Sequence, residues 1–351
     1  MKKSAKCIFP LILLAVTACR KDYPVETGEA ISFRADACAV ENVAATRATK
    51  TDYTNLTNNP FGVYGVCSVD KGAAVATNVF DNSSALKVEY NTTSGNWEYT
   101  RTGDKTKYYW KRKQNYRFRA YHPYSASVET GGSSADGILI NYRIFNDKYD
   151  LLVAFSTRCP NLDAEGIGTV PMQFHHALSA LRFRVAFDKT MDLETTDTLT
   201  EFHITGVQAA GMLKYSHKGD DYITEDITWS SDAFDSSTEF YQSTTERTFG
   251  VYDPENSAAS VEPVDVYGTS DTDNIVFAIP QTCSDSRYGD TVLHFKTTGG
   301  GNVDNTVVLP SIKWEAGKIY TYTLLIKRSK VQVEVTVKDW NEVQSTVDIN
   351  I

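Results

Sequence analysis

Apolar and polar residues alternate with a period of two along most of the chain. Every second side chain is apolar in "LRFRVAFD", residues 181–188, and valine takes every second position from Val331 to Val337 in "VQVEVTVKDW". Successive side chains of a β-strand point to opposite faces, so this pattern predicts strands with one buried face.

Further segments of the same kind are bounded by Gly, Asn, Asp and Pro, and no long helical period interrupts them. They are "FGVYGVCSV" (61–69), "YRFRAY" (116–121), "NIVFAIP" (274–280), "TVLHFKT" (291–297) and "KIYTYTLLI" (318–326). Many short strands separated by polar loops predict an all-β protein of the sandwich type. A loop-like tract at 161–171 divides the strands into two series. We therefore expect two β-sandwich domains, over residues 48–168 and 169–351.

The first 18 residues carry the pattern of a secretion signal. Three lysines within the first six residues precede a short apolar core, residues 8–16, which is too short to span a bilayer as a helix. Small residues directly before Cys19 are typical of the lipobox of bacterial lipoproteins, in which the cysteine becomes the acylated N-terminus. We predict a lipoprotein signal peptide over residues 1–18 and lipidation at Cys19. The alternative is a plain signal peptide with an incidental cysteine.

Composition excludes several classes of function. The chain has 35 Lys and Arg against 44 Asp and Glu, a net charge of −9, and no basic block that would bind nucleic acid. The cysteines lie far apart without a CxxC pair, which leaves zinc and redox motifs without support. The remaining alternatives are buried free thiols, or one bridge from Cys159 to either Cys67 or Cys283.

Catalytic motifs are also missing from the sequence. It contains no GxSxG, no P-loop and no HExxH, and adjacent strand residues such as His175 and His176 point to opposite faces and cannot easily share a metal ion. We expect no enzymatic activity, no cofactor and no metal. An aromatic group between Trp97 and Trp110 leaves two interpretations, sugar stacking or, as we favour, packing across strands.

Pieces along the whole chain resemble the fimbrillin family, the Mfa-like lipoprotein pilins of type V pili in anaerobic gut and oral bacteria. The matching pieces, in order, are the lipobox ending at Cys19, "ISFRA", "TRAT", "YYW", "YRFRAYHPY", "DLLVA", "FHHALSALRFRV", "FAIPQ", "WEAGKIYTYTLLI" and "VTVKDWN". The resemblance implies two tandem transthyretin-like (Greek-key) β-sandwiches. It also implies cleavage by an arginine-specific protease between Arg47 and Ala48, which would make residues 19–47 a pro-segment.

A cut at Arg47 has a physical consequence, because it separates a strand-like segment from the rest of the chain. We predict that this segment is a removable strand that fills an edge groove of the first sandwich, and that a C-terminal strand from the next subunit can replace it. The apolar positions of the removable strand are Ile31, Phe33, Ala35 and Ala37, and those of the donor strand are Val347, Ile349 and Ile351. Such a head-to-tail contact propagates into a filament.

The leading hypothesis is therefore a structural pilin subunit, of the shaft or the tip, that is exported as an outer-membrane lipoprotein and assembled into adhesive fimbriae at the cell surface. Its expected partners are other pilin subunits, the outer membrane through the lipid before maturation, and a ligand on a host or bacterial surface. The alternative is a surface lipoprotein that binds glycans or host proteins without polymerising.

Overall fold

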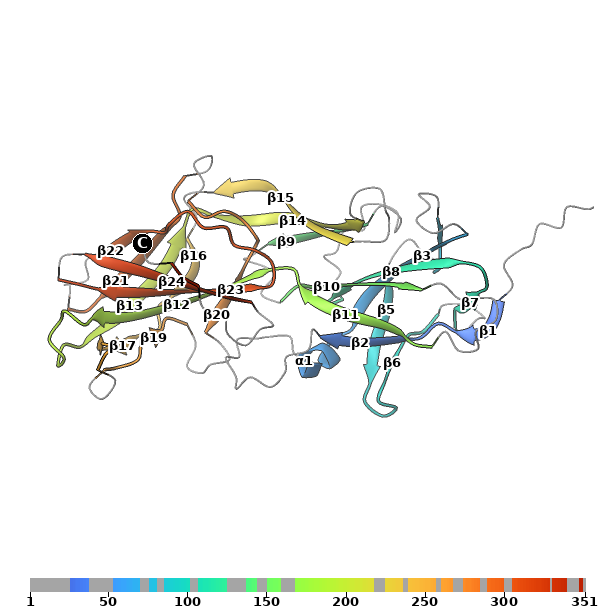
Figure 1. Cartoon of the computed structure of the whole chain (residues 1–351), viewed down its shortest axis with the longest axis horizontal. Helices are drawn as coiled ribbons and strands as arrows, with labels where there is room; N and C mark the ends of the chain where they lie inside the picture. The colour runs from blue at the N-terminus through green and yellow to red at the C-terminus, as the bar shows by residue number, and fades with distance from the viewer. Residues whose placement is uncertain are drawn as a thin grey trace, which may run out of the picture.

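The computed structural model is an elongated molecule built almost entirely of β-strands (Figure 1). One short helix, α1 (Tyr53–Asn58), lies among the strands of the N-terminal half. The expectation of an all-β fold is therefore confirmed. The structure describes residues 26–37, 53–69, 76–80, 85–101, 107–124, 137–143, 150–158, 168–217, 225–235, 239–256, 260–267, 274–284, 289–299, 305–328, 330–339 and 347–349.

An eight-stranded sheet surrounds the N-terminal core, and a pairing between its two distant members β3 and β8 closes seven of its strands into a ring. The ring runs β3 (Phe61–Ser68), β5 (Leu86–Asn91), β6 (Asn96–Glu98), β2 (Phe33–Ala37), β11 (Val170–His176), β10 (Leu152–Arg158) and β8 (Asn115–His122). The short β4 (Thr77–Asn78) adds to β3, and β1 (Glu26–Ala30) pairs with β7 (Tyr109–Lys111) in a separate ladder. Every pairing in the ring is antiparallel except that of β2 with β11.

The C-terminal half is a sandwich of two sheets whose apolar faces meet. The seven-stranded sheet contains β12 (Ser179–Asp188), β18 (Val251–Tyr252), β19 (Val264–Asp265), β20 (Ile275–Ala278), β23 (Lys318–Ile326), β24 (Val331–Asp339) and β25 (Val347–Ile349). The five-stranded sheet contains β13 (Asp197–Thr205), β16 (Phe240–Ser243), β17 (Arg247–Phe249), β21 (Val292–Thr297) and β22 (Asn305–Val308). Phe183 of β12 lies 5.1 Å, between ring centroids, from Phe202 of β13. The alternation read from the sequence at 181–188 and 331–337 thus marks strands of this sandwich.

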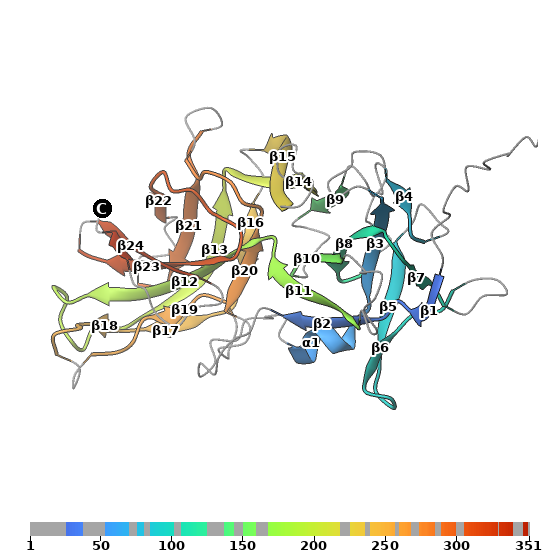
Figure 2. The ribbon, with the colours of Figure 1, turned by 45° about the vertical axis from the view of Figure 1, so that its right-hand side comes forward.

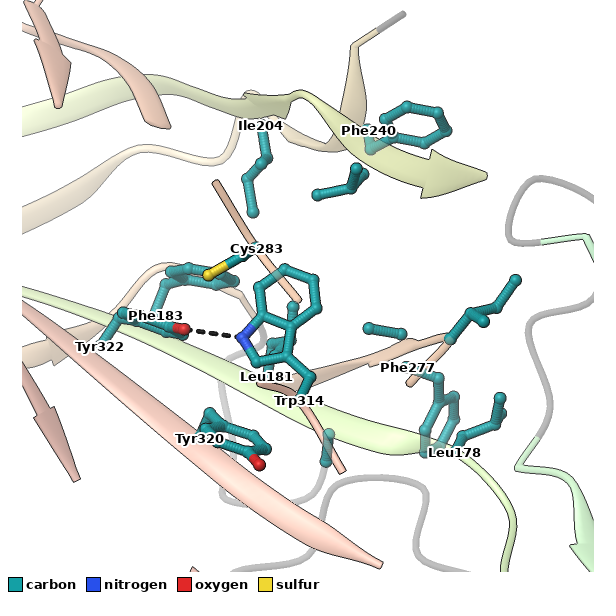
Figure 3. Close-up of a cluster of buried hydrophobic side chains, with 14 of the residues drawn as sticks. Leu178, Leu181, Phe183, Ile204, Phe240, Phe277, Cys283, Trp314, Tyr320 and Tyr322 are labelled. Carbon is teal, nitrogen blue, oxygen red and sulfur yellow. Dashed lines mark hydrogen bonds between the residues drawn. The ribbon is translucent and has the colours of Figure 1, made fainter. Parts of the chain in front are cut away.

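Several polar groups inside this second core are hydrogen-bonded. Figure 3 shows Trp314 pointing its indole nitrogen at Tyr322, to whose hydroxyl oxygen it donates over 2.7 Å. The Cys283 thiol beside them donates to the carbonyl oxygen of Pro310, and burial raises the pKa of this thiol. Burial of these groups with partners avoids the cost of unpaired polar atoms.

A third sheet joins the two halves of the chain. It consists of β9 (Ile138–Arg143), β14 (Val207–His217) and β15 (Glu225–Asp235), in the order β15-β14-β9. The inward residues of β9 belong to the same buried cluster as the C-terminal sandwich. Trp229 of β15 donates its indole N–H to the carbonyl oxygen of Ala177, at the point where β11 gives way to β12.

The buried apolar residues form two clusters, one inside the ring and one in the C-terminal sandwich. The expected boundary after residue 168 and the transthyretin-like topology remain predictions. β11 begins just beyond residue 168, yet its inward residues Val170, Met172 and Phe174 belong to the ring's cluster. The change from one cluster to the other follows His176, because Ala177 and Leu178 pack in the second.

Candidate functional site

The segment ahead of the expected cleavage site is a member of the closed ring. β2 lies between β11 and β6 (Figures 1 and 2). On one side it pairs in parallel with β11, from Phe33 opposite Val170 to Ala37 opposite Phe174. On the other side its only register pair with β6 is Phe33 opposite Trp97. The sequence predicted an edge groove, but the structure places β2 at an internal position of the sheet, flanked on both sides. We call this position the β2 slot.

The inward side chains of this segment are part of the N-terminal core. Ile31, Phe33 and Ala35 expose 1%, 3% and 0% of their surface, whereas Arg34 between them is exposed. The predicted alternation is confirmed at these positions, and the side chain of Ala37 lies outside the described residues. Burying side chains of the size of Ile and Phe contributes about 1.5–3 kcal/mol each. The ring's core is incomplete without this strand.

Phe33 is the centre of an aromatic cluster inside the ring. Its ring lies 5.6–6.5 Å, between centroids, from four other rings in edge-to-face arrangements, which is the favoured range for aromatic pairs. The four partners are Phe61, Phe80, Tyr99 and Phe118. Trp97 and Trp110 are buried in the same cluster, exposing 7% and 0%. Packing across strands is therefore the confirmed interpretation of the aromatic group between Trp97 and Trp110.

The backbone turns a corner between β1 and β2, and three hydrogen bonds hold it there. The Ile31 N–H donates to the Tyr108 carbonyl oxygen over 2.8 Å, and the Tyr99 hydroxyl donates to the Ile31 carbonyl oxygen over 2.7 Å. The Val170 N–H donates to the Ser32 carbonyl oxygen over 2.8 Å. The segment is thus bonded to the body of the protein at the corner as well as along β11.

The helix α1 follows β2 in the chain and lies against it, as Figure 2 shows. Leu56 of this helix is fully buried in the ring's cluster. Arg47 and Ala48 lie between β2 and α1 in the sequence, outside the described residues, as does Cys19.

The other predicted strand belongs to the C-terminal sandwich. β25 pairs antiparallel with β24, from Val347 opposite Val337 to Ile349 opposite Val335, and it forms the last strand on this side of its sheet. β24 pairs with β23 along nine residues, whereas β25 covers three of them. The backbone of Val347 and Ile349 is therefore at an edge, and Ile351 lies outside the described residues.

The rest of the described chain offers little chemistry. None of its His, Cys, Asp and Glu side chains form a group of three or more that could hold a metal ion. His176 is paired with Asp150 through a 2.8 Å contact from Nδ1 to Oδ2. Cys67 and Cys283 are buried free thiols, and Cys159 lies outside the described residues. No helix in the described ranges is long and apolar enough to cross a membrane.

The chain matches a protein-family model, and its fold is similar to that of several solved structures. The sequence model named Fimbrillin-like matches residues 46–340. The fold is similar to that of a protein from Bacteroides ovatus ATCC 8483 proposed to act in cell adhesion, with a TM-score of 0.53 and 14% identity over 90% of this chain and 99% of that one. It is also similar to a fimbrial protein from Bacteroides vulgatus ATCC 8482, with a TM-score of 0.50 and 17% identity over 88% of this chain and 99% of that one. A search of curated proteins gave no match.

Proposed function

The chain belongs to the fimbrillin-like family, and from this premise we propose that it is a structural pilin subunit, of the shaft or the tip, matured by cleavage after Arg47 and assembled by strand exchange. Export as an outer-membrane lipoprotein acylated at Cys19 precedes these steps. The observation that carries the proposal is the position of β2. It is a core strand of a closed ring, and it lies on the N-terminal side of Arg47.

Cleavage turns an internal strand into a separate segment. While the chain is continuous, β2 is tethered to α1, so β2 rebinds whenever it leaves the slot. After the cut, only non-covalent contacts hold β2, and its loss opens the ring between β6 and β11. Two rows of unpaired backbone groups and an apolar trench then accept an extended strand.

The donor in this proposal is β25 of another subunit. Its Val347 and Ile349, together with Ile351, contribute about 1.5–3 kcal/mol each when buried, before the cost of ordering the strand. β25 lies at a sheet edge in the C-terminal half of the molecule, and the slot lies in the N-terminal half (Figure 1). Repetition of this contact generates a head-to-tail fibre.

The alternative of a glycan-binding lipoprotein that does not polymerise gains nothing from the aromatic group. Stacking on a sugar requires an accessible ring face, and both tryptophans of that group are buried. The proposal therefore assigns the adhesive role to the assembled fibre and includes no catalytic step.

Treatment of the purified precursor with an arginine-specific protease tests the proposal. We expect a product that begins at Ala48, loss of the N-terminal segment and then polymers visible by electron microscopy. Arg47→Ala should remain an uncleaved monomer, while Arg112→Ala, at an exposed turn, should be processed like the wild type. A protease-treated protein that stays monomeric, or polymers formed by Arg47→Ala, would overturn it.

A further inference from the structure

The two sides of the β2 slot hold the resident strand differently. A five-residue ladder joins β2 to β11, whereas a single register pair joins it to β6. Tyr99 follows directly after β6 and reaches across to the corner of the segment. On the β6 side, the hydroxyl of Tyr99 therefore does what the backbone hydrogen bonds of the ladder do on the β11 side.

We propose that Tyr99 is a positioning residue of strand exchange, whose hydroxyl holds first the resident strand and then the donor strand at one fixed depth in the slot. This inference rests on the proposed function. It adds to that function a specific residue and a recognition rule.

The hydroxyl of Tyr99 is bonded in both directions. It donates to the Ile31 carbonyl oxygen over 2.7 Å and accepts the Tyr108 N–H over 3.3 Å. The Ile31 N–H in turn donates to the Tyr108 carbonyl oxygen. Tyr99 and Tyr108 therefore bind both backbone groups of residue 31 and leave its side chain free to face the core.

Neighbouring groups hold the Tyr99 ring independently of β2. The Tyr108 ring lies 6.0 Å away, and the Lys107 ammonium lies 4.7 Å from the Tyr99 ring centre and donates to the Tyr99 carbonyl oxygen. The Arg101 guanidinium covers Tyr108 at 4.2 Å and donates to the Lys107 carbonyl oxygen. These contacts keep the hydroxyl in place when the slot is empty. Burial raises the pKa of Tyr99, so the hydroxyl remains a proton donor.

An empty slot leaves this hydroxyl without its acceptor. A polar group that loses its partner inside a protein carries an energetic penalty, which an incoming strand removes by presenting a carbonyl oxygen. Every peptide unit has such an oxygen, so Tyr99 recognises any extended strand irrespective of its side chains. The fixed position of the hydroxyl sets how far the strand enters, and the apolar pockets then select the residues.

Tyr99→Phe removes the hydroxyl and keeps the ring, and Tyr90→Phe is the matched control because its ring packs on Trp97 in the same sheet. We expect Tyr99→Phe to speed two processes by about three- to tenfold, in line with one hydrogen bond. The first is loss of a labelled peptide of residues 26–37 from the cleaved protein. The second is release of subunits from polymers on dilution. Tyr90→Phe should leave both rates unchanged.

A peptide with an ester in place of the amide between Ile31 and Ser32 probes the same bond without changing the protein. Its weaker carbonyl acceptor should speed release from the wild type more than from Tyr99→Phe, which a general loss of stability in that variant would not produce. Faster peptide release with unchanged polymer dissociation would refute the donor half of the inference. Equal ester effects in both proteins would refute it entirely. If the wild-type protein forms no polymer, both the proposed function and the donor half of the inference are refuted. The peptide assay then still decides whether Tyr99 holds the resident strand.

Discussion

β2 and β25 are both short strands near an end of the chain, but their surroundings differ. β2 has a strand on each side and three buried residues of its segment face the ring's core. Among the strands that the structure describes, β25 has a partner on one side only, and it pairs with three residues of β24. Removal of β2 opens a closed ring, whereas removal of β25 leaves the nine-residue ladder between β23 and β24 unchanged.

In the proposed assembly, this difference explains why β2 would need a protease for its release and β25 would not. A core strand that is covalently attached returns to its slot faster than a competitor can enter, because its effective concentration is high. An edge strand exchanges against solvent at small cost, since the first and last segments of a domain open most easily. The proposal therefore assigns the cut to the resident strand and the donor role to the edge strand.

The largest loss of folding stability should come from Phe33→Ala in the uncleaved precursor. Truncation of a buried Phe costs about 3–5 kcal/mol of unfolding free energy, and Phe33 contacts four aromatic rings. Chemical denaturation followed by tryptophan fluorescence measures this loss, because Trp97 and Trp110 lie in the same cluster.

The exposed neighbour Arg34 provides the control on the same strand. Arg34→Ala should stay within about 0.5 kcal/mol of the wild type. If the two variants are equally stable, β2 is not a member of the core in solution and the comparison with β25 fails.

Acid should weaken the region around β2 selectively. His122 of β8 is buried against Phe174 of β11, and burial lowers its pKa to about 4 despite the opposing charge of Asp150. Below pH 6.5 the unfolded chain binds a proton that the folded chain excludes, so the free energy of unfolding falls until about pH 4. The shift corresponds to about 3 kcal/mol.

Urea titrations of wild type and His122→Gln between pH 7 and 4 measure this contribution. The variant should lose less stability over that range, and amide exchange should rise first in the strands of the ring. Parallel pH profiles for the two proteins would show that His122 is not the group responsible.

The sequence pattern was sufficient to locate many of the strands but not to predict which strands pair with one another. Alternation identified the segments of β12, β23 and β24, because each buries mainly one face. It also predicted the buried face of residues 31–35. It could not reveal the parallel pairing of β2 with β11, which joins segments more than 130 residues apart. Register between distant strands depends on the whole sheet and leaves no local signal.

Alternation also misled in β8. The pattern places Arg117 and Arg119 on a polar face, yet both are buried. The reason is that the second face of the ring is covered too, with Tyr64 and Tyr121 packed in the other apolar cluster. Gly62 opposite Tyr121 is part of the same arrangement, because a Cβ there would lie 2.5 Å from the tyrosine ring. The hydrogen bond from Tyr99 to Ile31 could not be predicted either, because a cluster of aromatic residues in the sequence does not indicate which hydroxyl donates to which carbonyl oxygen.

The smallest effect on folding and the sharpest effect on assembly should come from the same substitution, Ile349→Asp. At the edge of its sheet we expect this change to alter the free energy of unfolding by less than about 1 kcal/mol, since solvent can reach the edge. In the slot of a neighbour it would bury an unpaired charge, which is far more costly. Asp348→Asn, one position along, is the matched control and should assemble normally, because successive residues of an inserted strand lie on opposite faces. Thermal unfolding of the monomer and electron microscopy after protease treatment separate the two readouts. Fibres of normal length from Ile349→Asp would show that another segment fills the slot, whereas a large loss of monomer stability would mean that β25 is held as firmly as β2.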